Sequence, residues 1–515
     1  MGATATRTPP APSSAAPQPS ARRWPALAVL CVSLLIVTLD NTVLNVALPT
    51  LVRRMDATPN QLQWVVDAYA LVLGGLLLVA GSLADRIGRK RTFLAGLVLF
   101  AAGSTWAAFS GSVEMLIAAR AGMGIGAALI MPSTLALITD MFPEPGVRQR
   151  AIGIWSATSG LGIALGPIVG GLLLERYWWG SVFLINVPIA ALGLLLALLR
   201  VPDSRNPHAA RPDVLGALLS IAGIGAVLWA VIEAPVHGWS SRPVLYAGGA
   251  GIVMLLLFTM RELLTSHPML HLDFFRRRSF TAAVLSVAPA TFGLFGGMFV
   301  LTQYLQSGLG YSPYEAGLRL LPNAGAIAVC APAAALLVRK VGTKATATAG
   351  LLALAAGLAQ MSTVSAGSTY GDVLPGMILT GVGAGLVLPS ATGSVMGSLP
   401  REHTGVGSAT NGTFLQVGGA LGVAVIGSLL TTRYTDRMTA YAGEIRLPRA
   451  LEGAATESIG AAQRAAAQAG GETGAAVLQL ARRAFTSGMS IALLAGAAVA
   501  LVAAGAGFRE HVRSQ

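Results

Sequence analysis

Three ionisable side chains stand inside long apolar stretches of this 515-residue sequence: Asp40, Asp67 and Arg120. A charge at bilayer depth costs roughly 2.5–3.5 kcal/mol or more on insertion scales, so such groups usually face an interior cavity, a partner or a proton path. A desolvated carboxyl group can bind and release protons near neutral pH. Arg120 keeps its charge and is suited to tuning a neighbouring acid. We therefore expect proton or cation chemistry here, with a purely structural buried pair as the alternative.

Further polar residues surround Asp40 in the sequence. On a helix with 100° per residue, Thr38, Asn41 and Asn45 fall within roughly 160° of Asp40. This spacing predicts a polar stripe that forms one wall of a central cavity. An anionic wall suits cationic or amphipathic molecules, and apolar surroundings suit hydrophobic ones.

The elements that position these residues are membrane helices. The chain is 54% hydrophobic and 11% charged, with a mean hydropathy of +0.67. Its apolar residues come in blocks of about 18–25, the length that crosses about 30 Å of hydrocarbon. We predict an all-α polytopic membrane protein with about fourteen transmembrane helices. They are expected near residues 25–49, 62–83, 92–109, 113–139, 150–173, 180–199, 214–233, 243–260, 280–303, 314–338, 345–365, 371–396, 405–431 and 485–507.

The distribution of Arg and Lys orients the chain. The short loops on one side hold most of them, including Arg86, Arg89, Lys90, Arg148, Arg150, Arg276, Arg277, Arg339 and Lys340, whereas those on the other side hold only Arg53, Arg54, Arg176 and Arg242. Cytoplasmic loops carry such an excess, so we expect a multi-pass cell-membrane protein with both termini in the cytoplasm. Because the net charge of +13 is spread over many loops, we expect no nucleic-acid partner.

An internal repeat divides the chain. "GIGAALIMPS" at 124–133 recurs as "GVGAGLVLPS" at 381–390, and transporter folds are commonly built from duplicated halves. We expect a disordered cytoplasmic tail, a six-helix half, two inserted helices and a second six-helix half, at 1–23, 24–200, 201–262 and 263–515. The last part includes an extracellular loop, 432–484, whose Ala-rich portion favours a short surface helix.

Four motifs together resemble the fourteen-span drug:proton antiporters of the major facilitator superfamily, the EmrB/QacA-like group. "LDNTVLNVALP" (39–49) resembles the helix 1 motif of that group, and "GSLADRIGRKRTFL" (81–94) resembles the motif between helices 2 and 3. "LIAARAGMGIGAALIMPS" (116–133) resembles the helix 4 motif, and "GLGIALGPIVGG" (160–171) resembles the helix 5 motif associated with antiporters.

The resemblance implies a proton-coupled antiporter that exports hydrophobic or cationic drug-like compounds from the cytoplasm by alternating access. Its partners would be the small-molecule substrate, protons and the lipid bilayer. It would use the proton gradient and no cofactor, and would act as a monomer. For the residues inside the membrane, it implies a proton-coupling or substrate-binding role at Asp40, Asp67, Arg120, Asn41 and Asn45.

The turn between helices 2 and 3 is a candidate cytoplasmic gate. An acid and guanidinium groups there can form a charge-assisted cluster that holds the two halves together in one state and releases them in the other. In the second half Arg339 stands where the acid would be, so an equivalent second latch is not expected. The gate residues are Gly81, Asp85, Arg86, Gly88, Arg89 and, at the end of helix 4, Asp140.

The helix 5 motif has small residues at a regular spacing. Gly162, Gly166 and Gly170 recur every four residues, so they line one face and permit close approach of another helix. Pro167 lacks an N–H and bends its helix. With Gly171, these residues predict a packing seam that adjusts as a cavity opens and closes.

Other functions fit the sequence less well. Uptake of an endogenous metabolite is open, although the helix 5 motif argues against it. A membrane-embedded enzyme is not expected, because the sequence contains no HExxH, no GxSxG and no Walker lysine. A membrane sensor without transport is disfavoured by the acids inside the spans.

Overall fold

The computed structural model describes residues 20–205, 213–265, 272–398, 404–442 and 449–512, together with residues 268 and 270. Within these residues the chain is helical and contains no strand. Most of the predicted disordered tail lies outside the described residues. Its last part does not, because the first helix already begins at Ser20.

Seven helices build the first half of the bundle. They are α1 (Ser20–Met55), α2 (Pro59–Ile87), α3 (Arg89–Ala108), α4 (Val113–Met141), α5 (Pro145–Arg176), α6 (Ser181–Leu184) and α7 (Asn186–Arg200). The short α6 and α7 together make one apolar crossing. Side-chain caps begin two of these helices after tight loops: the Thr58 hydroxyl accepts the Gln61 N–H, and the Ser112 hydroxyl accepts the Met115 N–H.

Two helices separate the first half from the second. They are α8 (Val214–His237) and α9 (Arg242–Leu264). The second half follows with η1 (Leu272–Arg276), α10 (Arg278–Gln303), the π-helical segment η2 (Tyr304–Gly308), α11 (Pro313–Arg319), α12 (Leu321–Met361), α13 (Tyr370–Ser398), α14 (Thr404–Ala442), α15 (Arg449–Glu457), α16 (Ile459–Ala469) and α17 (Gly471–Val512).

Helix α12 crosses the bilayer twice. Among the described residues there are 13 helical stretches long and apolar enough to span a membrane. One of them joins α11 to α12 and runs for 49 residues from Pro313 to Met361. At 1.5 Å per residue an unbroken helix of that length would extend for about 70 Å, more than twice the hydrocarbon thickness. It breaks at Gly342, whose φ of 85° and ψ of 164° are not helical. The predicted spans 314–338 and 345–365 are therefore separate crossings, and the prediction of fourteen is confirmed.

The packing of glycines confirms the internal repeat. In the first half, a Cβ added at Gly96 of α3 would lie 2.9 Å from the carbonyl oxygen of Gly126 on α4. In the second half, a Cβ at Gly350 of α12 would lie 2.9 Å from the carbonyl oxygen of Gly383 on α13. Gly126 and Gly383 are the third residues of the two repeated segments. The two halves thus use the same residue for the same helix contact.

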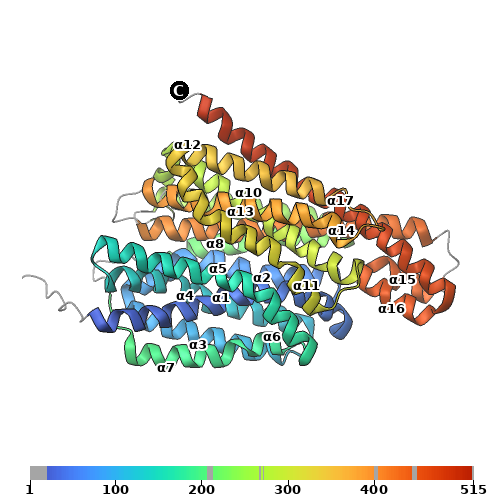
Figure 1. Cartoon of the computed structure of the whole chain (residues 1–515), viewed down its shortest axis with the longest axis horizontal. Helices are drawn as coiled ribbons and strands as arrows, with labels where there is room; N and C mark the ends of the chain where they lie inside the picture. Colours follow the sequence, from blue (N-terminus) through green and yellow to red (C-terminus); the bar gives the residue numbers. More distant parts are fainter. Residues whose placement is uncertain are drawn as a thin grey trace, which may run out of the picture.

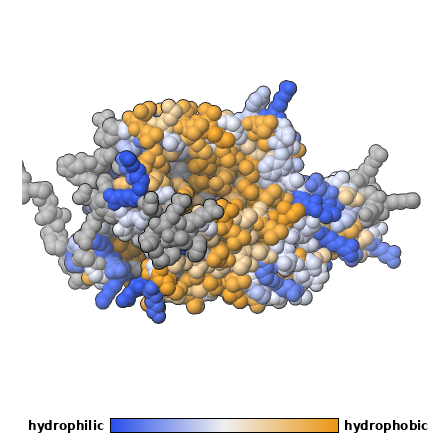
Figure 2. Space-filling model, turned by 90° about the horizontal axis from the view of Figure 1, so that it is seen from above, coloured by the Kyte–Doolittle hydropathy of each residue, from blue (hydrophilic) through white to orange (hydrophobic). Residues whose placement is uncertain are grey.

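The two halves lie side by side, and the helices of both run roughly along the long axis of the molecule (Figure 1). One end, which we call the loop end, carries α15 and α16. The opposite end, the terminal end, carries the start of α1 and the end of α17 (Figure 1). Apolar residues form a broad band across the middle of the surface, and hydrophilic residues gather toward the two ends (Figure 2), as expected for a membrane-spanning bundle.

Helices α8 and α9 form a hairpin beside the bundle. Helix α8 packs against α2 and α14, where the two halves meet, whereas α9 exposes apolar side chains such as Tyr246 and Leu264. At the terminal end, Asp213 caps α8 through the Gly216 N–H at 3.0 Å and accepts hydrogen bonds from Arg261 of α9 at 2.8–2.9 Å. Burial opposes ionisation of Asp213, but the bonds from Arg261 and Gly216 outweigh it and hold the pKa of Asp213 below its usual value.

The predicted loop 432–484 is shorter in the structure. Helix α14 continues to Ala442 and α17 begins at Gly471, so much of the predicted loop extends two spanning helices. The reason is packing: Tyr434 and Met438 of α14 and Val477 of α17 are buried, and the hydroxyl of Tyr434 donates to the carbonyl of Ala455 at 2.8 Å. The Ala-rich portion predicted as a short surface helix is divided in the structure between α16 and the first turns of α17.

Candidate functional site

Asp40 and Arg120 form a buried ion pair inside the first half. Arg120 of α4 bonds to the Asp40 carboxylate of α1, and the two side chains are 0% and 1% exposed. The Arg120 Nε donates to the carbonyl of Val65 on α2 at 3.1 Å, and its guanidinium lies 4.3 Å from the centre of the Tyr69 ring. Asn186 of α7 donates to the second Asp40 oxygen at 2.9 Å. Four helices are thus joined at one charged centre.

This geometry separates the polar residues of helix 1 that were expected to form one cavity wall. The Asp40 carboxylate bonds to Arg120 of α4 and Asn186 of α7, two helices of the first half. Thr38 packs against α5, because a Cβ at Gly162 would lie 2.0 Å from its hydroxyl. Asn41 is half-buried and Asn45 is buried. A proton-coupling or substrate role for Asp40, Asn41, Asn45 and Arg120 stays a prediction, and in this conformation the Asp40 carboxylate is buried and bonded to Arg120 and Asn186.

Sequence reasoning missed two members of this centre, Asn186 and Tyr69. Asn186 lies in the segment "FLINVPIA" (183–190) and Tyr69 in the segment "WVVDAYAL" (64–71). Neither side chain is charged at neutral pH, so a search for ionisable residues inside spans passes over them. An amide inside an apolar helix is the signal that could have found Asn186, because buried polar groups need partners.

Asp67 has a different environment from Asp40. Its side chain on α2 is 0% exposed, and neither carboxyl oxygen has a hydrogen-bond partner in the described part of the chain. Four residues earlier, Gln63 accepts a hydrogen bond from Ser428 of α14 at 3.3 Å. Seven residues later, a Cβ at Gly74 would lie 3.0 Å from Gln416 of α14. Asp67 shares this helix face, so it lies where the first half meets the second.

A buried carboxyl group without a partner is stable as the neutral acid, because burying the carboxylate without a partner costs far more free energy. Moving α14 away from α2 would admit water to the same group and permit ionisation. The site can therefore hold a proton while α2 and α14 are in contact and exchange it with water when they separate. Asp40 has different surroundings, because its carboxylate is bonded to Arg120 and Asn186.

The glycine seam of helix 5 packs against helix 1, as its spacing predicted. A Cβ at Gly166 would lie 1.9 Å from the Thr42 hydroxyl, and a Cβ at Gly170 would lie 2.9 Å from Val43. Thr42 also donates to the carbonyl of Gly162 at 3.3 Å. A larger residue at any of these glycines would push α5 away from α1.

Gly171 and Pro167 contact the second half instead. A Cβ at Gly171 would lie 2.6 Å from the carbonyl oxygen of Pro313. In return, a Cβ at Gly317 of α11 would lie 2.2 Å from the carbonyl oxygen of Pro167. Helices α5 and α11 therefore approach backbone to backbone, which closes the bundle between the two halves near the loop end.

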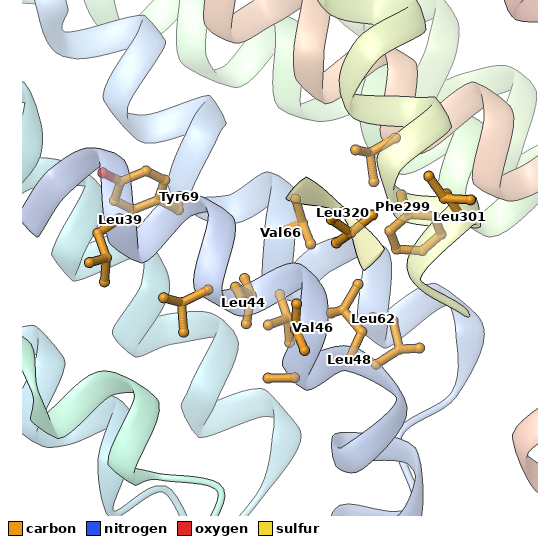
Figure 3. Packing of buried hydrophobic residues seen from close by; sticks show 14 of the residues in the cluster. Leu39, Leu44, Val46, Leu48, Leu62, Val66, Tyr69, Phe299, Leu301 and Leu320 are labelled. Carbon is orange, nitrogen blue, oxygen red and sulfur yellow. The ribbon is translucent and has the colours of Figure 1, made fainter. Parts of the chain in front are cut away.

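Further contacts reinforce the closure at the loop end. Gln306 of η2 donates to the carbonyl of Val46 on α1 at 2.8 Å. Apolar side chains of α1 and α2 face those of α10 and the α11–α12 junction in the same region (Figure 3). The residues labelled there are Leu39, Leu44, Val46, Leu48, Leu62, Val66, Tyr69, Phe299, Leu301 and Leu320.

Helix α16 covers this closure from outside the bundle. Arg464 bonds to the carbonyl of Val52 and to Asp56 at 3.2 Å, both of the first half. The neighbouring Gln463 donates to the carbonyl of Ser307 in the second half at 2.8 Å. One short helix thus bridges both halves.

The candidate gate at the terminal end has its predicted partners. Arg89 of α3 bonds to Asp85 of α2 at 2.8 Å and also to Asp140 of α4. Gly88 adopts a φ of 118°, which requires glycine in this turn, and Arg86 is exposed. Among the described residues, every side-chain bond among Asp85, Arg89 and Asp140 stays within the first half, and only the backbone N–H of Arg89 reaches beyond it, to the carbonyl of Ser204 at 2.8 Å. The cluster therefore does not tie the halves together in this conformation, and a gate role stays a prediction.

Gly81 is less constrained than expected. A Cβ there would lie 3.8 Å from Pro132 of α4, an ordinary contact.

Among the described residues, there is no group of three or more His, Cys, Asp or Glu side chains that could hold a metal ion.

Comparison with known proteins agrees with this architecture. The family model of the Major Facilitator Superfamily matches residues 30–423. Over 483 residues, the chain is 36% identical to the multidrug efflux pump LfrA of Mycolicibacterium smegmatis, covering 94% of this chain and 95% of that protein. Over 489 residues, it is 35% identical to the tetracenomycin C resistance and export protein of Streptomyces glaucescens, covering 94% and 90%.

Among solved structures, the fold resembles the inward-facing, unoccupied crystal structure of a bacterial homolog of the human lysosomal transporter Spinster. The TM-score is 0.64 at 17% identity, with coverage of 96% of this chain and 99% of that chain. The family match, the full-length relatives and the repeated helix packing agree. This chain is a multi-pass membrane protein that belongs to the Major Facilitator Superfamily of transporters.

Proposed function

We propose that this protein exports hydrophobic or cationic drug-like compounds from the cytoplasm in exchange for protons. The observation that carries the proposal is Asp67, a fully buried carboxyl group without a partner in the described chain, at the contact between the two halves. The multidrug efflux and antibiotic resistance names of relatives at 34–37% identity support an exported small-molecule substrate.

We further propose that the terminal end faces the cytoplasm and that one chain is the working unit. The excess of Arg and Lys in loops at that end supports this orientation. With the loop end closed by α5, α11 and α16, the conformation is then inward-facing. A single chain supplies both halves and the contact between them, so alternating access needs no second copy.

The exchange follows from the position of Asp67. When the loop end opens, α2 and α14 separate and Asp67 takes a proton from outside. Closure buries the neutral acid and opens the cytoplasmic side. A substrate that enters there between the halves separates α2 from α14 again, which readmits water to Asp67 and lets the proton leave. The Asp40–Arg120 centre holds α1, α2, α4 and α7 together so that the first half moves as one body.

Inverted membrane vesicles test the proposal. Addition of methyl viologen or ethidium to energised vesicles should release protons from the lumen as the compound enters. An Asp67→Asn variant should fold but lose this proton release, whereas the matched Asp273→Asn variant, changed at an exposed acid of η1, should keep it. Proton release by Asp67→Asn at the wild-type rate would remove Asp67 from the coupling. Unchanged resistance of a deletion strain across a broad compound panel would favour metabolite transport instead.

A further inference from the structure

A line of polar side chains runs along α2 from the loop end to Asp67. Asn60, Gln63 and Asp67 are three and four residues apart, so they share one helix face. Asn60 is 7% exposed, and Gln63 and Asp67 are 0% exposed. Seven residues at 1.5 Å each place Asp67 about 10 Å deeper than Asn60.

Other helices contribute polar groups to the same line. Asn60 donates to Oε2 of Glu233 on α8 at 3.1 Å, and His237 approaches that oxygen at 3.7 Å. Ser428 of α14 donates to Gln63 at 3.3 Å. The line is therefore built by α2, α14 and α8, the first of the two inserted helices.

Exposure falls steadily along the line. The side chains of His237 and Glu233 are 45% and 19% exposed, and from Asn60 inward the groups are buried. Within the described residues, the amide nitrogen of Gln63 has no acceptor, and one helical turn further the two carboxyl oxygens of Asp67 have no donor. Buried polar atoms left open in this way are costly. They are accounted for if the line takes up water and a proton in another state of the cycle.

We propose that Glu233 is the outer proton acceptor that loads Asp67. A proton moves from external water to the Glu233 carboxylate. It then passes, through water held by the Asn60 and Gln63 amides and the Ser428 hydroxyl, to the Asp67 carboxylate, which leaves Glu233 ionised again. This inference rests on the proposed function and gives the inserted helix α8 a part in transport.

The charged surroundings of Glu233 are limited. In the described chain its polar contacts are Asn60 on α2 and His237 on its own helix. The other ionisable groups toward the loop end of the helices that pack on α8 are Asp67 on α2, Arg242 and Tyr246 on α9, and Arg433, Tyr434, Asp436, Arg437 and Tyr441 on α14. Within the described residues, Glu233 forms no ion pair with Arg or Lys, so no fixed cation competes with a proton for its carboxylate.

The test compares Glu233→Gln with Glu233→Asp in reconstituted full-length protein. Substrate-driven proton movement is recorded at a series of external pH values. Glu233→Gln keeps an oxygen for Asn60 but cannot titrate, so the exchange rate should fall about tenfold or more and lose its dependence on external pH. The concentration of ethidium that gives half-maximal rate should not change. Glu233→Asp should restore most of the rate and the pH dependence.

The matched control is Glu175→Gln. Glu175 is an exposed acid of α5 near the loop end, and the variant should behave as wild type. A second variant on the line, Gln63→Met, should slow proton movement as Glu233→Gln does. If Glu233→Gln retains the wild-type rate and pH profile while wild type shows coupling, this inference alone is overturned. Equal losses in Glu233→Gln and Glu233→Asp, with lowered thermal stability, would make Glu233 a helix anchor and overturn it too. Absence of substrate-driven proton movement in wild type would overturn the proposed function as well.

Discussion

Replacing Asp40 by Asn should destabilise the protein, because it leaves the Arg120 cation buried without a compensating charge. Arg120 is 0% exposed, and its remaining partners in the described chain would be the Val65 carbonyl, the Tyr69 ring face and, at 4.0 Å, the Met123 sulfur, none of them charged. Its second terminal nitrogen already has no partner in the described chain. Removing one member of a buried ion pair typically costs about 3–5 kcal/mol. Even the lower figure is a factor of roughly 100 in the folding equilibrium.

The two partners should not be equivalent. After Arg120→Gln, the remaining Asp40 carboxylate can take up a proton and become neutral, whereas a guanidinium cannot lose its charge. Asp40→Asn should therefore be the more damaging single change. The double variant Asp40→Asn/Arg120→Gln buries no charge and should recover most of the lost stability, so the double-mutant cycle should show a coupling of about 3 kcal/mol.

Unfolding in mixed micelles, followed by fluorescence, measures these differences, with Asp273→Asn as an exposed control. Transport assays on the same preparations show whether loss of activity follows loss of stability. The reasoning is refuted if Asp40→Asn unfolds at the wild-type midpoint yet has lost substrate-driven proton movement. In that case Asp40 titrates during transport and Arg120 does not hold it.

Three further changes test other contacts. Gly317→Ala places a methyl group 2.2 Å from a backbone oxygen of α5, so the loop end should fail to close and transport should stop in a folded protein. The control is Gly325→Ala, where the added methyl group has no neighbour within 4 Å in the described chain. Equal transport activity of the two variants would contradict the role of the α5–α11 contact in closing the loop end. Arg464→Gln removes the ion pair with Asp56, which at an exposed site is worth at most about 1 kcal/mol. The rate at which a water-soluble thiol reagent labels a cysteine placed beneath α16 should therefore rise, by up to about fivefold. An unchanged labelling rate would mean that α16 does not hold the closure. For Asp213, the folded-state pKa lies below the unfolded value, so its stabilisation is present above about pH 4 and is lost as pH falls through the lower folded pKa. The melting-temperature difference between wild type and Asp213→Asn should therefore vanish in strong acid, and a constant difference would contradict this account.

Much of the fold was predictable because bilayer chemistry leaves few choices. Backbone polar groups must be satisfied within helices, so apolar blocks of the right length become spans. This rule found both crossings that Gly342 separates within α12. It failed at 432–484, because Ala-rich segments such as 471–484 are not apolar enough to read as spans, yet they extend helices once neighbouring helices cover them.

The candidate site was predictable in its residue types but not in its pairings. Asp40 and Asp67 look alike in the sequence, as single acids inside apolar helices. In the structure Asp40 meets Arg120, eighty positions away, whereas Asp67 lies on the face of α2 that packs against α14 and has no hydrogen-bond partner in the described chain. Helical periodicity relates residues on one helix and says nothing about which neighbouring helix they face. The link from Asn60 to Glu233, 173 positions apart, was hidden for the same reason.

The sequence by itself determined the membrane class, the crossings, the repeat and the motifs, because these depend on local length, hydropathy and spacing. Tertiary structure alone decided that Asp40 is paired with Arg120, whereas the similar acid Asp67 has no hydrogen-bond partner in the described chain. That choice depends on the packing of helices distant in sequence, since the cost of a buried charge is set by the groups that surround it.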